Sequence, residues 1–155
     1  MKLTKIALIG LMSMSSLVAE FDPFGIKFGD TLDNYKVIKK YEFGAISGAV
    51  VKAPEPDGFF NSFSVHIVPR TGKIYVVNAE RDTTSVEECK EAATVLKKEF
   101  EKGFGPEDKE FKDWDWSRPY EYRKTFKVDG KEYFLELTCL TVREVVSLMI
   151  STDLE

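Results

Sequence analysis

The single histidine of this chain, His66, is the first residue to consider for chemistry. One histidine cannot supply a zinc site built from several imidazoles. His66 alternates with Ser62 and Ser64, so a strand here places all three side chains on one face. A Ser–His pair at this spacing could touch, but the sequence offers no nucleophile elbow, orienting carboxylate or oxyanion loop. We therefore expect a solvated strand histidine and assign no catalytic residue.

Carboxylates and tryptophans alternate in Asp113-Trp114-Asp115-Trp116. Calcium takes oxygen ligands, but this spacing matches no calcium-binding loop, so we expect neither a metal nor a cofactor. Exposed aromatic side chains can stack on sugars or anchor protein partners. We expect Trp114 and Tyr122 to pack in the core, and we keep Trp116 as a candidate contact residue.

The segment 53–60, Ala-Pro-Glu-Pro-Asp-Gly-Phe-Phe, is the best candidate for a recognition loop. Pro54 and Pro56 stiffen it, and the Asp-Gly step that follows turns the chain. A stiff loop loses little conformational entropy on binding. Strand parity places Phe59 in the core and leaves Phe60 on the polar face, beside the histidine. The predicted partner-binding residues are Pro54, Pro56, Asp57, Phe60 and Trp116.

One long helix is predicted after residue 84. Ser85 followed by Glu88 is a capping box, which indicates a helix start at Ser85. Gly103 and Gly105 indicate an end near Lys102. Apolar residues recur at helical spacing and form one buried stripe, which consists of Cys89, Ala92, Ala93, Leu96 and Phe100.

Asp129-Gly130 is a favoured two-residue hairpin loop, and it fixes the register of the strands on either side. Counting outward from it gives one face that a helix would cover and one solvated face with opposite-charge pairs. The covered face pairs Phe126 with Tyr133, Lys124 with Leu135, Tyr122 with Leu137 and Tyr120 with Cys139, and the solvated face pairs Arg123 with Glu136 and Lys127 with Glu132.

The two cysteines, Cys89 and Cys139, are thus both expected where the helix meets the sheet. In an oxidising compartment such a pair forms a disulfide. Further strands are predicted at 46–52, 62–67, 73–77 and 145–152, whereas 35–43 fits a strand or a short helix. The fold class is α+β: an antiparallel sheet of hairpins, with one long helix on one face and one disulfide.

Residues 1–19 are predicted to be a secretory signal peptide, with a basic start, an apolar run and a small residue, Ala19, at the cleavage point. Residues 20–155 then form one α+β domain that is periplasmic or secreted and does not span a membrane. The whole chain carries a net charge of −4, and loss of Lys2 and Lys5 makes the remainder −6. This acidic balance argues against nucleic acid and favours a basic partner.

Three functional classes fit this sequence. The first is a non-enzymatic binding protein, such as an inhibitor or immunity-like factor acting on another protein. The second is an envelope-associated structural or accessory domain that docks through sheet edges or aromatic residues. The third is a carboxylate-dependent glycan-acting enzyme. An apolar patch beside the proline loop would favour the first class, an uncovered edge strand the second, and a cleft with paired acids the third.

Overall fold

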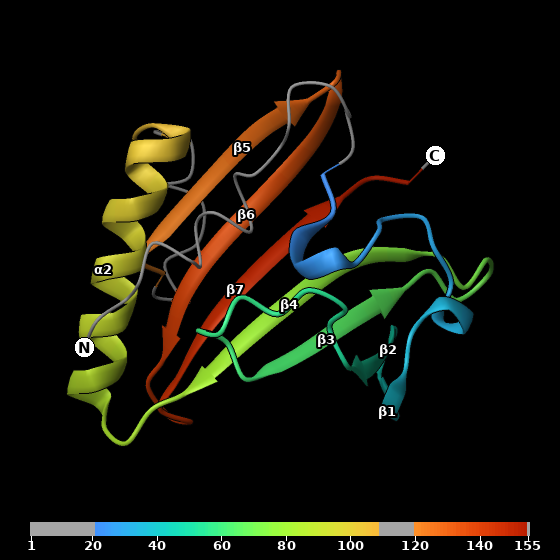
Figure 1. Ribbon diagram of the computed structural model, residues 1–155, viewed down its shortest axis with the longest axis horizontal. Helices are drawn as coiled ribbons and strands as arrows, with labels where there is room; N and C mark the ends of the chain where they lie inside the picture. The colour runs from blue at the N-terminus through green and yellow to red at the C-terminus, as the bar shows by residue number, and fades with distance from the viewer. Residues whose placement is uncertain (1–20, 109–119, 155) are drawn as a thin grey trace.

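A seven-stranded antiparallel sheet with one long helix against it forms the frame of the protein (Figure 1). The computed structural model describes residues 21–108 and 120–154. The elements in chain order are the 3-10 turns η1 (Pro23–Gly25) and η2 (Leu32–Asn34), strands β1 (Val37–Phe43), β2 (Ile46–Val51), β3 (Ser62–Ile67) and β4 (Ile74–Asp82), helix α2 (Val86–Phe104), and strands β5 (Tyr122–Val128), β6 (Lys131–Leu140) and β7 (Val145–Thr152).

The strand order across the sheet is β1-β2-β3-β4-β7-β6-β5, so β1 and β5 are the two edges. The α+β class is confirmed, and the segment predicted as either strand or helix is strand β1. The predicted signal peptide lies outside the described residues. Within the described ranges, none of the helices combines the length and the apolar character needed to cross a membrane.

Helix α2 follows the prediction closely. The Ser85 hydroxyl oxygen accepts a hydrogen bond from the Glu88 amide at 3.1 Å and so caps the helix start. The Glu88 carboxylate accepts from the Thr84 amide at 2.8 Å, one residue before the position that a standard capping box uses. Gly105 ends the helix with a φ of 91°. The buried residues are the five of the predicted stripe: Cys89, Ala92, Ala93, Leu96 and Phe100.

The β5–β6 hairpin has the register counted from its loop. Val128 faces Lys131, Phe126 faces Tyr133 and Tyr122 faces Leu137. The loop residues Asp129 and Gly130 have φ values of 51° and 79°, as a type I′ turn requires.

The predicted disulfide between Cys89 and Cys139 is confirmed, with 5.7 Å between the two Cα atoms. It ties α2 to β6 across the core, where Cys89 is fully buried.

Two expectations about this hairpin are wrong. Tyr120 does not pair with Cys139, because β5 begins at Tyr122 and the Tyr120 ring instead lies 3.9 Å from the guanidinium carbon of Arg123. The Arg123–Glu136 pair is not solvated: its N–O distance is 2.7 Å and the two side chains are 4% and 9% exposed. The tyrosine ring over the guanidinium accounts for part of this burial.

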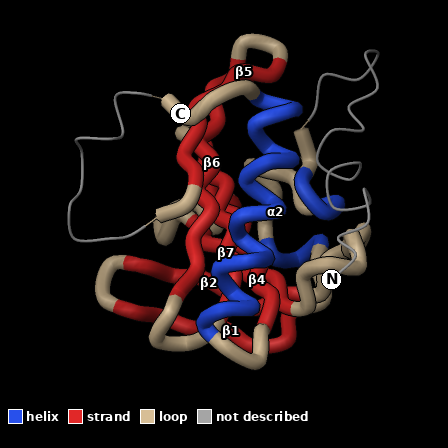
Figure 2. The backbone as a smooth tube through the Cα atoms, turned by 90° about the vertical axis from the view of Figure 1, so that its left-hand side faces the viewer, coloured by secondary structure: helices blue, strands red, loops and turns tan. Residues whose placement is uncertain are grey.

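The N-terminal segment supplies a part of the core that no sequence pattern assigned. Helix α2 covers the end of the sheet formed by β5, β6 and β7 (Figures 1 and 2). Residues 21–28 pack beside it on the same face, where the Phe21 ring lies 5.2 Å from Tyr133 and the Phe24 ring 5.0 Å from Phe63. Together the segment and the helix close one continuous core.

Candidate protein-binding surface

The proline loop differs from the predicted recognition loop in which of its residues reach solvent. Pro54 and Pro56 are exposed, as expected. Phe60 is only 4% exposed, so its predicted place on the polar face is wrong. Its ring lies 5.7 Å from that of Phe24 and 4.8 Å from that of Phe59, and the N-terminal segment thus draws both phenylalanines into the core. The apolar patch expected from Phe60 therefore does not form there.

The buried Asp57 side chain stabilises this loop by hydrogen bonds to its backbone. The side chain is 7% exposed, and its Oδ1 atom accepts hydrogen bonds from the amides of Phe59 at 3.1 Å and Phe60 at 3.2 Å. Burial raises the pKa of the Asp57 carboxyl, against the lowering effect of these amides. Asp57 is placed to shape the loop, and its role in partner binding stays a prediction. Trp116, the fifth predicted contact residue, lies outside the described residues.

His66 lies on the outer face of the sheet, on the same face as Ser62 and Ser64, and is half-buried there. Its ring lies between two tyrosines, with centroid distances of 6.2 Å to Tyr41 and 6.3 Å to Tyr75. Its Nε2 atom is 3.4 Å from the side-chain amide nitrogen, Nδ2, of Asn78. Burial lowers the pKa of His66, which favours the neutral imidazole near pH 7. In the described part of the chain no group of acidic, histidine or cysteine residues could hold a metal ion.

A hollow of about 570 Å³ lies beside the β5–β6 turn and the end of β7. Glu132 and Asp153 are its acidic lining residues, with Thr125, Phe134 and Ser151 beside them. A glycan-acting enzyme would need two carboxyl groups flanking the scissile bond. This hollow is therefore where the third functional class would be tested.

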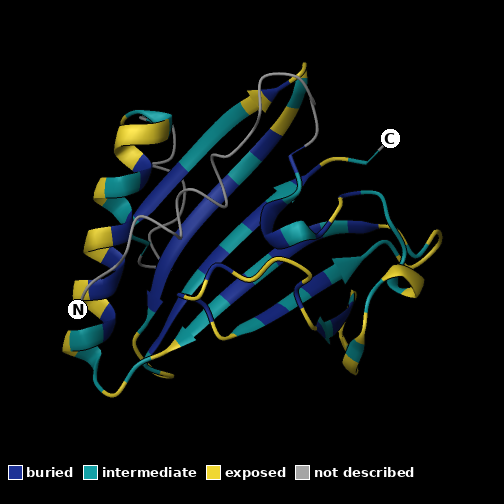
Figure 3. Ribbon diagram, in the orientation of Figure 1, coloured by how far each residue is buried: buried dark blue, intermediate teal, exposed yellow. Residues whose placement is uncertain are grey.

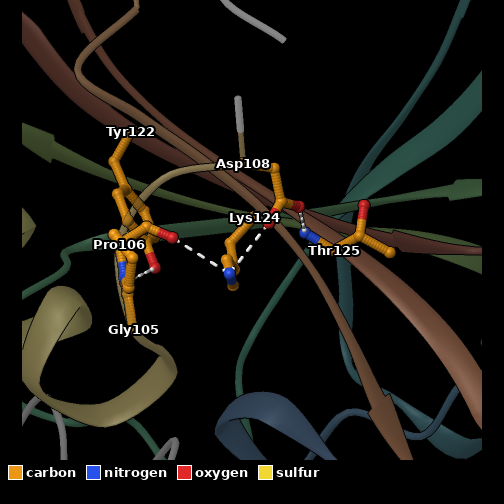
Figure 4. A network of polar contacts seen from close by, with 6 residues as sticks. All are labelled: Gly105, Pro106, Asp108, Tyr122, Lys124 and Thr125. Carbon is orange, nitrogen blue, oxygen red and sulfur yellow. Dashed lines mark hydrogen bonds and ion pairs between the residues drawn. The ribbon is translucent and has the colours of Figure 1, made fainter. Parts of the chain in front are cut away.

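Residues 106–108 cover the β5 edge of the sheet at residues 123–125 (Figure 4). The Asp108 carboxylate accepts a hydrogen bond from the Thr125 amide at 2.7 Å, and the Asp108 amide donates to the Arg123 carbonyl at 3.3 Å. Lys124 donates to Asp108 at 2.8 Å and to the Pro106 carbonyl at 2.9 Å. Two outward-pointing backbone groups of β5, the Arg123 carbonyl and the Thr125 amide, are thus already bonded within the chain and are closed to a foreign strand.

The β1 edge is different. Among the described residues, no backbone hydrogen bond reaches residues 38–43 from any element other than β2. An edge strand in this state offers a row of amide and carbonyl groups to another chain. The pairing with β2 has an irregularity at Ile38, because Val37 faces Val51 while Lys39 faces Val50. The regular part of the open edge therefore runs from Lys39 to Phe43.

The β1–β2 turn shows which backbone groups point outward. Phe43 faces Ile46 across a two-residue loop, and in such a hairpin the closing pair exchanges hydrogen bonds. Bonded and non-bonded pairs alternate along an antiparallel ladder, so Tyr41 also bonds to β2. Lys40 and Glu42 then direct their amides and carbonyls away from the sheet. The same count on β5 selects Arg123, Thr125 and Lys127, and Asp108 binds the first two of them.

Large apolar side chains are exposed along this edge and at its turn. Ile38 is 66% exposed, Phe43 is 80% exposed and Ile46 on β2 is 37% exposed. Figure 3 colours the whole chain by burial, with exposed residues in yellow. Lys39, Lys40 and Glu42 are exposed between them. A surface that combines apolar and charged side chains with free backbone groups can bind an extended polypeptide.

Tyr41 holds β1 in place from the outer face. It stands opposite Gly48, and a Cβ atom added to Gly48 would lie 2.6 Å from the tyrosine ring and 2.5 Å from the Val65 carbonyl oxygen. The missing side chain therefore lets the ring lie across β2. On the inner face, Val37 packs against the core. The edge is preformed, so little entropy is lost when another strand pairs with it.

No sequence pattern marked β1 as part of a site. Its residues Val-Ile-Lys-Lys-Tyr-Glu-Phe have no clean two-residue alternation, and that is why strand and helix both fitted. A two-residue loop that begins with glycine, Gly44-Ala45, is the local pattern that indicates a hairpin here. Gly44 has the positive φ, 60°, that the first position of such a turn needs.

Comparisons of the chain with protein-family models, with curated proteins and with solved structures find no match.

Proposed function

We propose that this protein is a non-enzymatic binding protein of the periplasm or the extracellular space, and that it acts by pairing another polypeptide with the open edge of β1. The observation that carries the proposal is the contrast between the two sheet edges. Asp108 binds outward backbone groups of β5, whereas the outward backbone groups of β1 have no hydrogen-bond partner within the described residues. Strand addition uses such groups for affinity and flanking side-chain contacts for specificity.

The same docking mode serves either of the first two classes. An inhibitor or immunity-like factor would use it to hold the protein that it blocks, and an envelope-associated accessory domain would use it to join a larger complex. The disulfide and the anchoring of β1 by Tyr41 favour both, because a rigid edge binds with a small entropic cost. The carboxylate-dependent enzyme is the remaining alternative.

The test is site-specific photo-crosslinking in the cells that make the protein. A photoreactive residue replaces Ile38, which is 66% exposed at the β1 edge, and in a second variant it replaces Val142, which is 98% exposed in the β6–β7 turn. We expect a defined adduct with a polypeptide from position 38 and none from position 142. Equal adducts from both positions, or none from position 38, would overturn the proposal.

A proline variant provides the matched control for backbone pairing. Glu42→Pro removes an outward amide and leaves the bonds between β1 and β2 in place, since Glu42 directs its amide away from the sheet. We expect this variant to fold and to lose the adduct at position 38. An undiminished adduct would mean that side chains alone bind the partner.

A further inference from the structure

We infer that the occupant of the β1 edge is a second copy of this chain, which pairs β1 with β1 to make one sheet through two molecules. This inference rests on the proposed function, because it names the partner of the same edge. It follows from the charge pattern of β1 and from the symmetry that two identical strands must obey.

Symmetry restricts the registers that two copies can adopt. Identical strands side by side in one sheet run antiparallel about a two-fold axis perpendicular to the sheet. Rotation about that axis leaves the inner faces of both molecules on the same side of the joint sheet. Residues that stand opposite each other must therefore point to the same face. Lys40 stands opposite the buried Ala49 and so lies on the inner face with Glu42, while Tyr41 stands opposite Gly48 on the outer face with Lys39 and Phe43.

Three centres remain for the regular segment Lys39–Phe43 once its end residues are set aside. A register centred on Lys40 places Lys40 against Lys40, and one centred on Glu42 places Glu42 against Glu42. Like charges directly opposite each other destabilise a strand pair. The register centred on Tyr41 places Lys40 against Glu42, and the two-fold axis repeats this attractive pair.

Backbone geometry agrees with the same register. Lys40 and Glu42 are the residues whose amides and carbonyls point outward, so each Lys40–Glu42 pair can exchange two backbone hydrogen bonds. The Tyr41 residues of the two copies then stand opposite each other as a non-hydrogen-bonded pair, with their side chains close together on the outer face. Lys39 stands over Phe43 of the other copy, where an ammonium group and an aliphatic stem can cover the 80% exposed ring.

The lysines also explain why an arbitrary strand would not bind. Lysine on an edge strand ordinarily prevents pairing, because its charge is left without a partner. Here only a strand that brings a carboxylate opposite Lys40 compensates that charge, and β1 itself supplies it as Glu42. The irregularity at Ile38 limits the regular pairing to a few residues, so we expect a dissociation constant in the micromolar range or weaker.

The test is a charge exchange in the purified protein, followed by sedimentation velocity over a micromolar to millimolar series at low salt. Both side chains are exposed, so the variants are expected to fold. We expect the unchanged protein to dimerise with rising concentration. Lys40→Glu sets two carboxylates opposite each other in both symmetry-related pairs and should weaken dimerisation at least about tenfold. The double variant Lys40→Glu with Glu42→Lys restores the opposite charges and should return the constant to within about threefold of its original value.

A protein that stays monomeric over the whole series would overturn self-pairing, as would a double variant that stays as weak as the single one. The photo-crosslink at position 38 separates this failure from failure of the proposed function. An adduct with the mass of two chains supports self-pairing. An adduct with a different polypeptide overturns self-pairing and leaves edge docking intact, and no adduct overturns both.

Discussion

Removal of the disulfide should lower the melting temperature by an amount that its loop length sets. Cys89 and Cys139 are 50 residues apart, so the bond closes a loop that holds most of α2, all of β5 and most of β6. The chain-entropy relation gives ~4 kcal/mol for a loop of this length. With an unfolding entropy of ~2.1 cal/mol/K per residue, this loss lowers the melting temperature of a domain of roughly 135 residues by about 14 °C.

The assay is thermal unfolding of the double variant Cys89→Ala with Cys139→Ala, followed by circular dichroism. Both cysteines are buried, so loss of the sulfur atoms adds a cavity cost to the lost cross-link. The unchanged protein treated with a reducing agent is the matched control, because it loses the bond and keeps both sulfur atoms. A fall of less than about 4 °C in both samples would refute the loop-closure reasoning.

Three further perturbations test the hairpin, the buried ion pair and the loop. Gly130→Val should cost about 1–3 kcal/mol, because Gly130 has a φ of 79°, whereas Gly130→Asn should cost less, and urea unfolding compares the two. Arg123→Ala removes the guanidinium that pairs with the buried Glu136 carboxylate and should cost about 3–5 kcal/mol, while replacing both residues by Met and Leu should cost clearly less in the same assay. The pKa of Asp57 is raised in the fold, so its carboxylate destabilises the protein as pH rises from about 4 through the raised value. Asp57→Asn should remove that decrease and so gain stability relative to the unchanged protein from about pH 4 to about pH 7, and a constant difference across this range would contradict the assignment.

Local rules predicted much of the fold. The Asp129-Gly130 loop set every pair of β5 and β6 by counting, because side chains alternate strictly along a strand. The stripe through Cys89 and Phe100 placed the helix face, and the two predictions together placed the disulfide. These are short-range patterns, and tertiary packing left them unchanged.

The errors lie where a distant segment decides burial. Strand parity puts Phe60 on the wrong face. This residue precedes β3, so the alternation of the strand does not apply to it, and its side chain packs against the Phe24 ring. The Arg123–Glu136 pair has the predicted register but not the predicted exposure, because the register does not reveal that Tyr120 turns back over the guanidinium.

Residue patterns alone were enough to specify the helix, the β5–β6 register and the cysteine pair, since each depends on residues close together in the chain or on one stripe meeting one face. Which strands form the edges follows only from the folded arrangement. Strand order depends on the pairing of β4 with β7, two strands that α2, β5 and β6 separate in the sequence. No local pattern encodes that choice. The same packing brought Asp108 to β5 and left β1 open, and the candidate binding surface exists for that reason.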